Sequence, residues 1–186
     1  MARLKSRPYV PYDEAFSEFT NLRREFNAYA EKSGQKFLTE FEKLKVAGAR
    51  ENTVAMDLLA YYYKSGVGNF LDENYSRYIH WEMLSASRGN QLAIEKLQFL
   101  IGYACDIIMD HEKFNLIMYK NDIDENNVLY VLGKAIAKIY VREYKIYPID
   151  LYALKDESKP FKKEYFSSFR HQIDQIIPKT VEYLLS

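Results

Sequence analysis

The fold is decided by residues 55–97, which run AMDLLAYYYKSGVGNFLDENYSRYIHWEMLSASRGNQLAIEKL. Apolar residues recur there at helical spacing on both sides of the Gly66-Val67-Gly68 loop, and a second stop follows at Gly89. Small side chains let helices approach closely, and larger apolar side chains fill the space between helix pairs. We therefore interpret this stretch as a scaffold without a catalytic group. Small residues are expected at the helix crossings and large ones between the pairs: Ala55, Ala86 and Ala93, with Leu58, Tyr62, Trp81 and Leu97.

Outward from this stretch, the hydrophobic period predicts about eight helices and no strand. Capping residues and glycine stops set the expected boundaries. Helices are expected to begin at Asp13, at Asn52 or Thr53, and at Asp72, and to end at Ser33-Gly34, Gly66 and Gly89. The expected helices cover about 13–32, 35–47, 53–64, 72–88, 91–110, 125–145 and 160–186, the last kinked or restarted at Pro178. Residues 111–123 are less regular, and 145–160 are expected to form a loop with room for a short turn.

Composition places the chain among globular proteins and restricts what it binds. Its 186 residues are 48% hydrophobic and 28% charged, which suits one domain with a real core. Because 26 basic and 26 acidic side chains leave no net charge, no overall field draws the protein onto nucleic acid or an anionic membrane. The charge is uneven: residues 51–133 carry 6 basic and 12 acidic side chains, and residues 134–170 carry 9 and 5. Solvated helix faces explain this pattern most simply, and a functional patch is the alternative.

The only cysteine is Cys105, so no internal disulfide is possible, and its apolar surroundings predict a buried thiol that packs like alanine. The first residues lack the apolar segment of a secretory signal. No run of about 18 uncharged apolar residues is present either. We therefore expect a cytoplasmic protein that makes no membrane contact.

The order of small residues, glycines and aromatic residues in 55–93 resembles a Sel-like repeat, a relative of the tetratricopeptide repeat. The span from Ala55 to Ala93 is 38 residues, which suits a helix-pair repeat. Degenerate copies flank it: residues 41–59 parallel 81–97, and Ala93 starts another unit that lacks its glycine loop. The resemblance is carried by Ala55, Leu58, Tyr62, Gly66, Gly68, Asp72, Trp81, Ala86, Gly89 and Ala93.

This resemblance implies an all-α fold, a tetratricopeptide-like α-solenoid of stacked antiparallel helix pairs. One helix pair cannot bury its apolar stripe alone, so neighbouring pairs must stack on it. We expect a repeat core at about 35–110 and a longer C-terminal helical cap at about 124–186. Together they would form a single domain, 13–186, behind an extended N-terminal arm, 1–12.

The resemblance also implies a non-enzymatic protein-binding module that needs no cofactor. An adaptor, or an inhibitor or immunity-type partner of another bacterial protein, would fit. In such stacks the first helix of a pair lines the concave side, so exposed residues of the helix at 53–64 are expected to contact a protein or peptide. These are Asp57, Tyr61, Tyr62 and Lys64. The oligomeric state is left open.

Two other functional classes have candidate residues. Asp106 and Asp110 lie four apart beside His111, so a metal site or a hydrolase could form there, although acids at a helix end are usually solvated. Basic residues also recur at spacings of four, four and three on the long helix at 125–145: Lys134, Lys138, Arg142 and Lys145. A solvated face is the simplest interpretation of this stripe, an acidic protein partner is the next, and nucleic acid is the least favoured.

Overall fold

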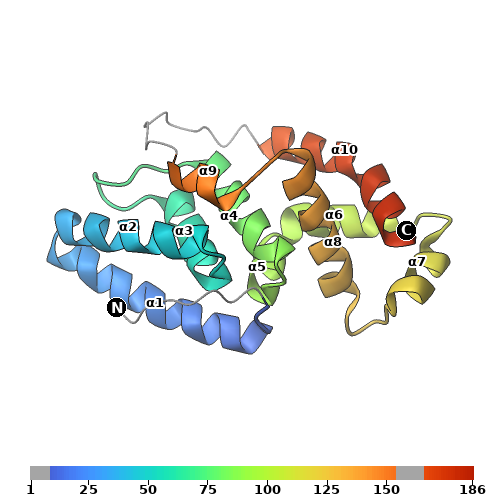
Figure 1. Cartoon of the computed structure of the whole chain (residues 1–186), viewed down its shortest axis with the longest axis horizontal. Coiled ribbons are helices and arrows are strands. Elements are labelled where there is room, and N and C mark those ends of the chain that lie inside the picture. The colour runs from blue at the N-terminus through green and yellow to red at the C-terminus, as the bar shows by residue number, and fades with distance from the viewer. Residues whose placement is uncertain (1–8, 154–165) are drawn as a thin grey trace.

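The computed structural model describes residues 9–153 and 166–186 and contains ten helices in those ranges (Figure 1). The described part of the chain has no strand, which agrees with the predicted all-α class. None of its helices is both long and apolar enough to cross a membrane. The helices are α1 Tyr12–Lys32, α2 Gly34–Ala49, α3 Thr53–Ser65, α4 Tyr75–Ser87, α5 Gln91–Lys96, α6 Gln98–Met109, α7 Phe114–Asn121, α8 Val128–Glu143, α9 Pro148–Ala153 and α10 Phe166–Leu185.

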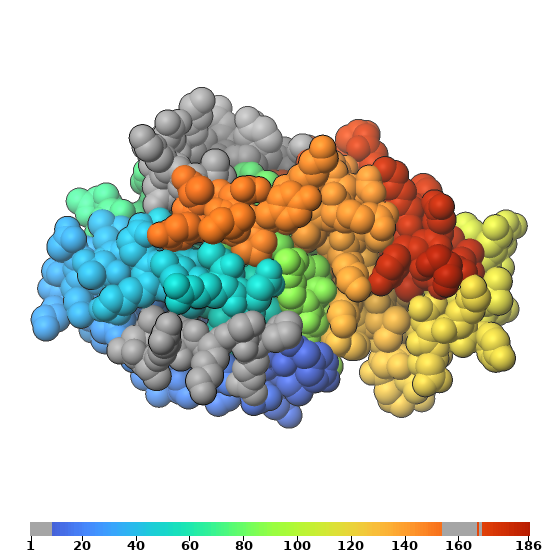
Figure 2. Space-filling model, viewed as in Figure 1, coloured from blue at the N-terminus to red at the C-terminus, as the bar shows by residue number. Residues whose placement is uncertain are grey.

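The helices pack in pairs along the long axis of the molecule. α1 and α2 form an antiparallel hairpin around Ser33, α3 packs against both of them, and α4 lies against α3 (Figure 1). α4 then contacts α8, and α8 contacts α6 and α10. The space-filling view shows α1 and α2 at one end of the body, with α7 and α10 at the other (Figure 2). Packed helix pairs are therefore the architecture, as expected.

The turn before α3 recurs before α5. The Asn52 side chain caps α3 by accepting a hydrogen bond from the Ala55 N–H at 2.8 Å, and Asn90 caps α5 by accepting one from Ala93 at 3.4 Å. Asn90 follows Asn52 by 38 residues, and Ala93 follows Ala55 by 38 residues. The two turns also touch, since the Asn90 amide donates to the Thr53 carbonyl at 3.3 Å. The asparagine-capped turn therefore recurs in the structure after 38 residues.

A left-handed residue precedes each of these asparagine caps. Gly89 has φ +96°, whereas Glu51 in the first turn has φ +66° without being glycine. Arg88 holds the Glu51 carboxylate with two bonds, from Nε at 2.7 Å and Nη2 at 3.2 Å. This bidentate ion pair fixes the one turn to the other and offsets the strain at Glu51.

Gly89→Ala is expected to lower the free energy of unfolding by about 1–2 kcal/mol, because an L-residue resists this positive φ. The new Cβ would also lie 3.0 Å from the Tyr130 hydroxyl oxygen. Gly102→Ala is the matched control: its Cβ meets nothing within 4 Å, and alanine in a helix is expected to stabilise by up to about 1 kcal/mol. Urea unfolding of both variants measures the difference, and equal stabilities would contradict a requirement for glycine at position 89.

Trp81 is fully buried at the centre of the core. Gly48 of α2 makes room for it, since a Cβ there would lie 3.1 Å from the indole ring. Gly133 of α8 plays the same part farther along, where a Cβ would lie 2.6 Å from Ile94. The small residues expected at crossings, Ala55, Ala86 and Ala93, are all fully buried, as are Leu58 and Leu97, while Tyr62 is buried to within a few per cent.

Several predicted helix boundaries are wrong. α1 begins at Tyr12, so Asp13 lies inside its first turn instead of capping it. Asp72 is exposed and does not cap α4, because Asn74 accepts the N-terminal bond, from the Arg77 N–H at 3.0 Å. The helix expected at 91–110 is broken at Leu97 into α5 and α6.

The C-terminal half is also more helical than expected. α7 occupies the segment described as less regular, and α9 occupies part of the expected loop. α10 continues through Pro178 without restarting. Residues 154–160 of that loop, and the residues where the last helix was expected to begin, lie outside the described residues.

The N-terminal arm is described only from Tyr9 onward, and residues 1–8 lie outside the described residues. Val10 is fully buried, and its carbonyl accepts a hydrogen bond from the Gln91 N–H at 3.2 Å. The Tyr12 N–H in turn donates to the Gln91 side chain at 3.1 Å. The end of the arm is therefore bound to the start of α5.

Candidate interaction site

The surface predicted on α3 is largely covered. Asp57 is fully buried and Tyr62 is 3% exposed, so neither meets a partner in this conformation. α1 packs across α3, and the Tyr62 hydroxyl donates to the Asn27 side chain of α1 at 2.8 Å. Tyr62 is covered because α1 packs on α3, and Asp57 is covered because it lies in the interior between α3 and α4.

Tyr61 and Lys64 remain at the surface. Tyr61 is half-buried between the edge of Phe19, at 5.7 Å between ring centroids, and the Arg23 guanidinium, at 5.7 Å from its ring. Lys64 is exposed, with its ammonium 5.2 Å from the centre of the Tyr78 ring. Both side chains therefore already contact their own chain.

Two carboxyl groups share the interior between α3 and α4. Glu82 is 1% exposed and lies within hydrogen-bonding reach of Asp57, and Lys96 of α5 pairs with Asp57 at 2.9 Å. Burial, followed by the neighbouring Asp57 charge, raises the pKa of Glu82 well above its ordinary value, while Lys96 and Lys64 act in the opposite direction. The Glu82 carboxyl group therefore holds its proton more tightly in the folded protein than in the unfolded chain.

This proton predicts a pH dependence of stability. Because the folded protein holds the Glu82 proton more tightly than the unfolded chain, its stabilisation is complete below the ordinary pKa of 4.5. It is lost as pH rises toward the higher pKa of the folded state. Relative to Glu82→Gln, the unfolding free energy of the natural protein is expected to fall by up to about 1.4 kcal/mol per pH unit above about pH 5.

Urea unfolding at several pH values measures this difference. His80 has the opposite dependence, since burial lowers its pKa to about 4, but His80 is present in both proteins and cancels in the comparison. Glu112→Gln, at an exposed position, is the control and should leave the pH dependence unchanged. A constant difference between the natural protein and Glu82→Gln would show that Glu82 is ionised in the folded state.

The basic stripe on α8 is partly neutralised. Lys138 and Arg142 are exposed, but Lys138 donates to the Tyr183 hydroxyl at 3.2 Å and Arg142 pairs with Glu143 at 3.2 Å. Lys134 is half-buried, with its ammonium 5.7 Å from the centre of the Tyr130 ring. Binding of an acidic protein or nucleic acid to this stripe stays a prediction.

The metal and nucleophile candidates find no support. Among residues 9–153 and 166–186, no three His, Cys, Asp or Glu side chains converge in a group that could hold a metal ion. Asp106 and Asp110 are exposed, and His111 Nδ1 accepts the Lys113 N–H at 3.2 Å. Cys105 is buried as predicted, and burial raises the pKa of its thiol to about 12, which removes the thiolate at neutral pH.

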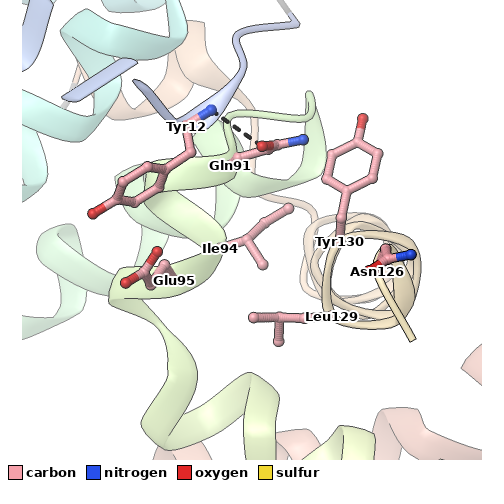
Figure 3. A pocket seen from close by; sticks show the side chains of 7 residues that line it. All are labelled: Tyr12, Gln91, Ile94, Glu95, Asn126, Leu129 and Tyr130. Atoms are coloured by element: carbon pink, nitrogen blue, oxygen red, sulfur yellow. Dashed lines mark hydrogen bonds between the residues drawn. The ribbon is translucent and has the colours of Figure 1, made fainter. Parts of the chain in front are cut away.

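A recess that the sequence did not reveal lies where the starts of α1 and α8 meet α5 (Figure 3). It encloses about 190 Å³. Tyr12 and Tyr130 stand on opposite sides, with Ile94 between them and Leu129 beside it (Figure 3). The remaining lining side chains are polar: Gln91, Glu95 and Asn126.

Exposed aromatic side chains extend the recess on both sides. Phe16 is 52% exposed and stacks on Tyr12 with 6.1 Å between ring centroids. Tyr9 is 53% exposed and meets Tyr130 edge to face, also at 6.1 Å. We call Phe16, Tyr12, Tyr130 and Tyr9, with the recess they border, the aromatic rim.

Sequence reasoning missed the aromatic rim because its members come from three distant segments. Spacings of three and four residues place Phe16 on one stripe of the first helix with Phe19 and Phe26. Phe19 and Phe26 are buried, but Ala15 takes the inward position next to Phe16. The one available signal was the position of Phe16 on the first helix, one residue after the inward-facing Ala15.

No protein-family model, curated protein or solved structure matches the chain.

Proposed function

We propose that the chain is a Sel-like helical-repeat module that binds another protein, as an adaptor or inhibitor, and performs no catalysis. The partner sits on the aromatic rim at the meeting point of α1, α5 and α8. The 38-residue recurrence of the asparagine-capped turn supports the repeat assignment, with one full helix pair, α3 and α4, between partial copies.

The aromatic rim is the observation that carries this proposal. Exposed tyrosine and phenylalanine side chains around a recess are typical of the centre of a protein interface, because they bury large area at a small cost in side-chain entropy. Two exposed aromatic residues, Tyr9 and Phe16, continue the two walls of one recess. A rim of this kind supports recognition of a protruding side chain of a partner.

Partner capture tests the proposal. The immobilised chain is expected to retain a protein from a lysate of its source, and Tyr9→Ser/Phe16→Ser is expected to reduce retention at least about tenfold, since hot-spot truncations cost 2 kcal/mol or more. The matched control is Leu116→Ser/Ile149→Ser, which removes two residues that are 50% and 60% exposed elsewhere. If both double variants reduce retention equally, or if neither reduces it, the aromatic rim is not the binding site.

A further inference from the structure

The recess is the size of a side chain. Its volume of about 190 Å³ is below the roughly 300–1,000 Å³ of pockets that hold cofactors or drug-sized ligands. Its walls are two tyrosine rings, and the buried Ile94 lies between them (Figure 3). An aliphatic stem would pack against these apolar surfaces.

The charge of the recess is negative. Glu95 is exposed and is the one charged side chain among the seven that line it. The turn that carries Asn126 adds the exposed acids Asp122, Asp124 and Glu125 nearby in sequence. The Asp124 carboxylate accepts the Asn126 N–H at 2.8 Å and so orders this turn next to the recess.

Lys134 lies outside the lining, one helical turn along α8 from Tyr130. Its ammonium already lies 5.7 Å from the centre of the Tyr130 ring, which shows that this ring accepts a cation. The Tyr12 ring stacks on Phe16. The Glu95 carboxylate lies on the same side of the recess as the Tyr12 ring (Figure 3).

We infer that the recess binds a basic side chain, lysine or arginine, of the protein partner. The aliphatic stem lies on Ile94 and Leu129 between the two tyrosine rings, and the cationic end pairs with Glu95. Aromatic faces and a carboxylate both favour a cation, and no lining group would neutralise an anion. This inference rests on the proposed function, because it names the chemistry by which the aromatic rim recognises its partner.

A peptide titration tests the inference. The ¹⁵N-labelled full chain is titrated with acetyl-Gly-Arg-Gly-amide, acetyl-Gly-Lys-Gly-amide and the neutral acetyl-Gly-norleucine-Gly-amide. Saturable shifts are expected at the backbone amides of Gln91, Glu95 and Asn126 with a basic peptide, and affinity for the neutral peptide should be at least about fivefold weaker. The arginine and lysine peptides show which cation fits better.

Glu95→Gln should weaken binding of the basic peptide at least about threefold, whereas Glu112→Gln, an exposed acid between α6 and α7, should leave it unchanged. Equal binding of the neutral peptide, or shifts confined to another surface, would overturn the inference. If the basic peptides do not bind but partner capture still depends on Tyr9 and Phe16, the proposed function stands. The inference that the recess binds a basic side chain is then wrong. If the peptides bind but no protein is captured, the proposed function fails.

Discussion

Lys96→Met is expected to lower the free energy of unfolding by about 3 kcal/mol at neutral pH. Lys96 forms an ion pair with the fully buried Asp57, and removing it leaves this carboxyl group in the core without its basic partner. The cost lies at the lower end of the range for broken buried pairs, because the Lys96 side chain is 29% exposed. Lys96 also opposes the rise in the pKa of Glu82, so its removal favours the protonated form of Glu82. The loss should therefore be smaller at about pH 5 than at about pH 8.

Adding Asp57→Asn to this variant separates charge from packing. If the uncompensated charge is the cause, the double variant should recover at least about half of the loss, and its stability should depend less on pH. Chemical denaturation of the single and double variants at both pH values gives the coupling energy. A double variant that is less stable than Lys96→Met would indicate that the Lys96 stem, whose ammonium lies 3.3 Å from the centre of the Phe19 ring, matters more than the ion pair.

Trp81→Ala is expected to cost about 4 kcal/mol, the largest loss among the substitutions proposed. The indole is fully buried at the junction of α2, α3 and α4, and a cavity of its size cannot close by small shifts of rigid helices. Gly48 and Leu59 crowd together beside it, so the surrounding helices are already at close approach.

Leu116→Ala is the control for this measurement. Leu116 is 50% exposed on α7, and its loss should change stability by no more than about 0.5 kcal/mol. Circular dichroism during urea unfolding follows both variants without relying on tryptophan fluorescence. A loss below about 1 kcal/mol for Trp81→Ala would show that the indole does not bridge the helix pairs.

Local sequence signals predicted the part of the fold that local physics controls. Asn52, Gly66 and Gly89 mark helix boundaries because a capping side chain or a positive φ acts within a few residues. Asp13 and Asp72 have the same capping chemistry, yet Pro11 and Asn74 occupy the cap positions. At the start of α4, both Asp72 and Asn74 are able to cap the helix, and the sequence does not indicate which of them does so.

Side-chain burial was harder to predict where tertiary packing overrides helical period. The run Tyr61-Tyr62-Tyr63 had to place one ring outward, and Tyr61 is that ring. Asp57 was expected on the same open surface, because an acid on a helix is usually solvated. Its burial depends on Lys96, 39 residues away, which no pattern on α3 indicates.

Apart from the position of Phe16, nothing in the sequence indicated the candidate site. The aromatic rim joins residues near position 12, position 91 and position 130, and the contact of the N-terminal arm with the start of α5 creates it. Gly133 lets α8 approach Ile94 so closely that a Cβ at position 133 would lie 2.6 Å from the Ile94 side chain. In the sequence this glycine lies within a helical pattern that does not indicate the close approach. Local signals therefore predict the helices, whereas the recess depends on how distant segments of the chain meet.

Hydrogen–deuterium exchange of the chain, alone and with its captured partner, tests the central claim most directly. The proposed module predicts slower exchange in the complex at amides of residues 9–16, 91–95 and 126–130, the three segments of the aromatic rim. Exchange in the first half of α2, at the opposite end of the α1–α2 hairpin from Tyr12, should not change. Protection confined to the basic stripe on α8, with the three rim segments unchanged, would contradict a binding site on the aromatic rim.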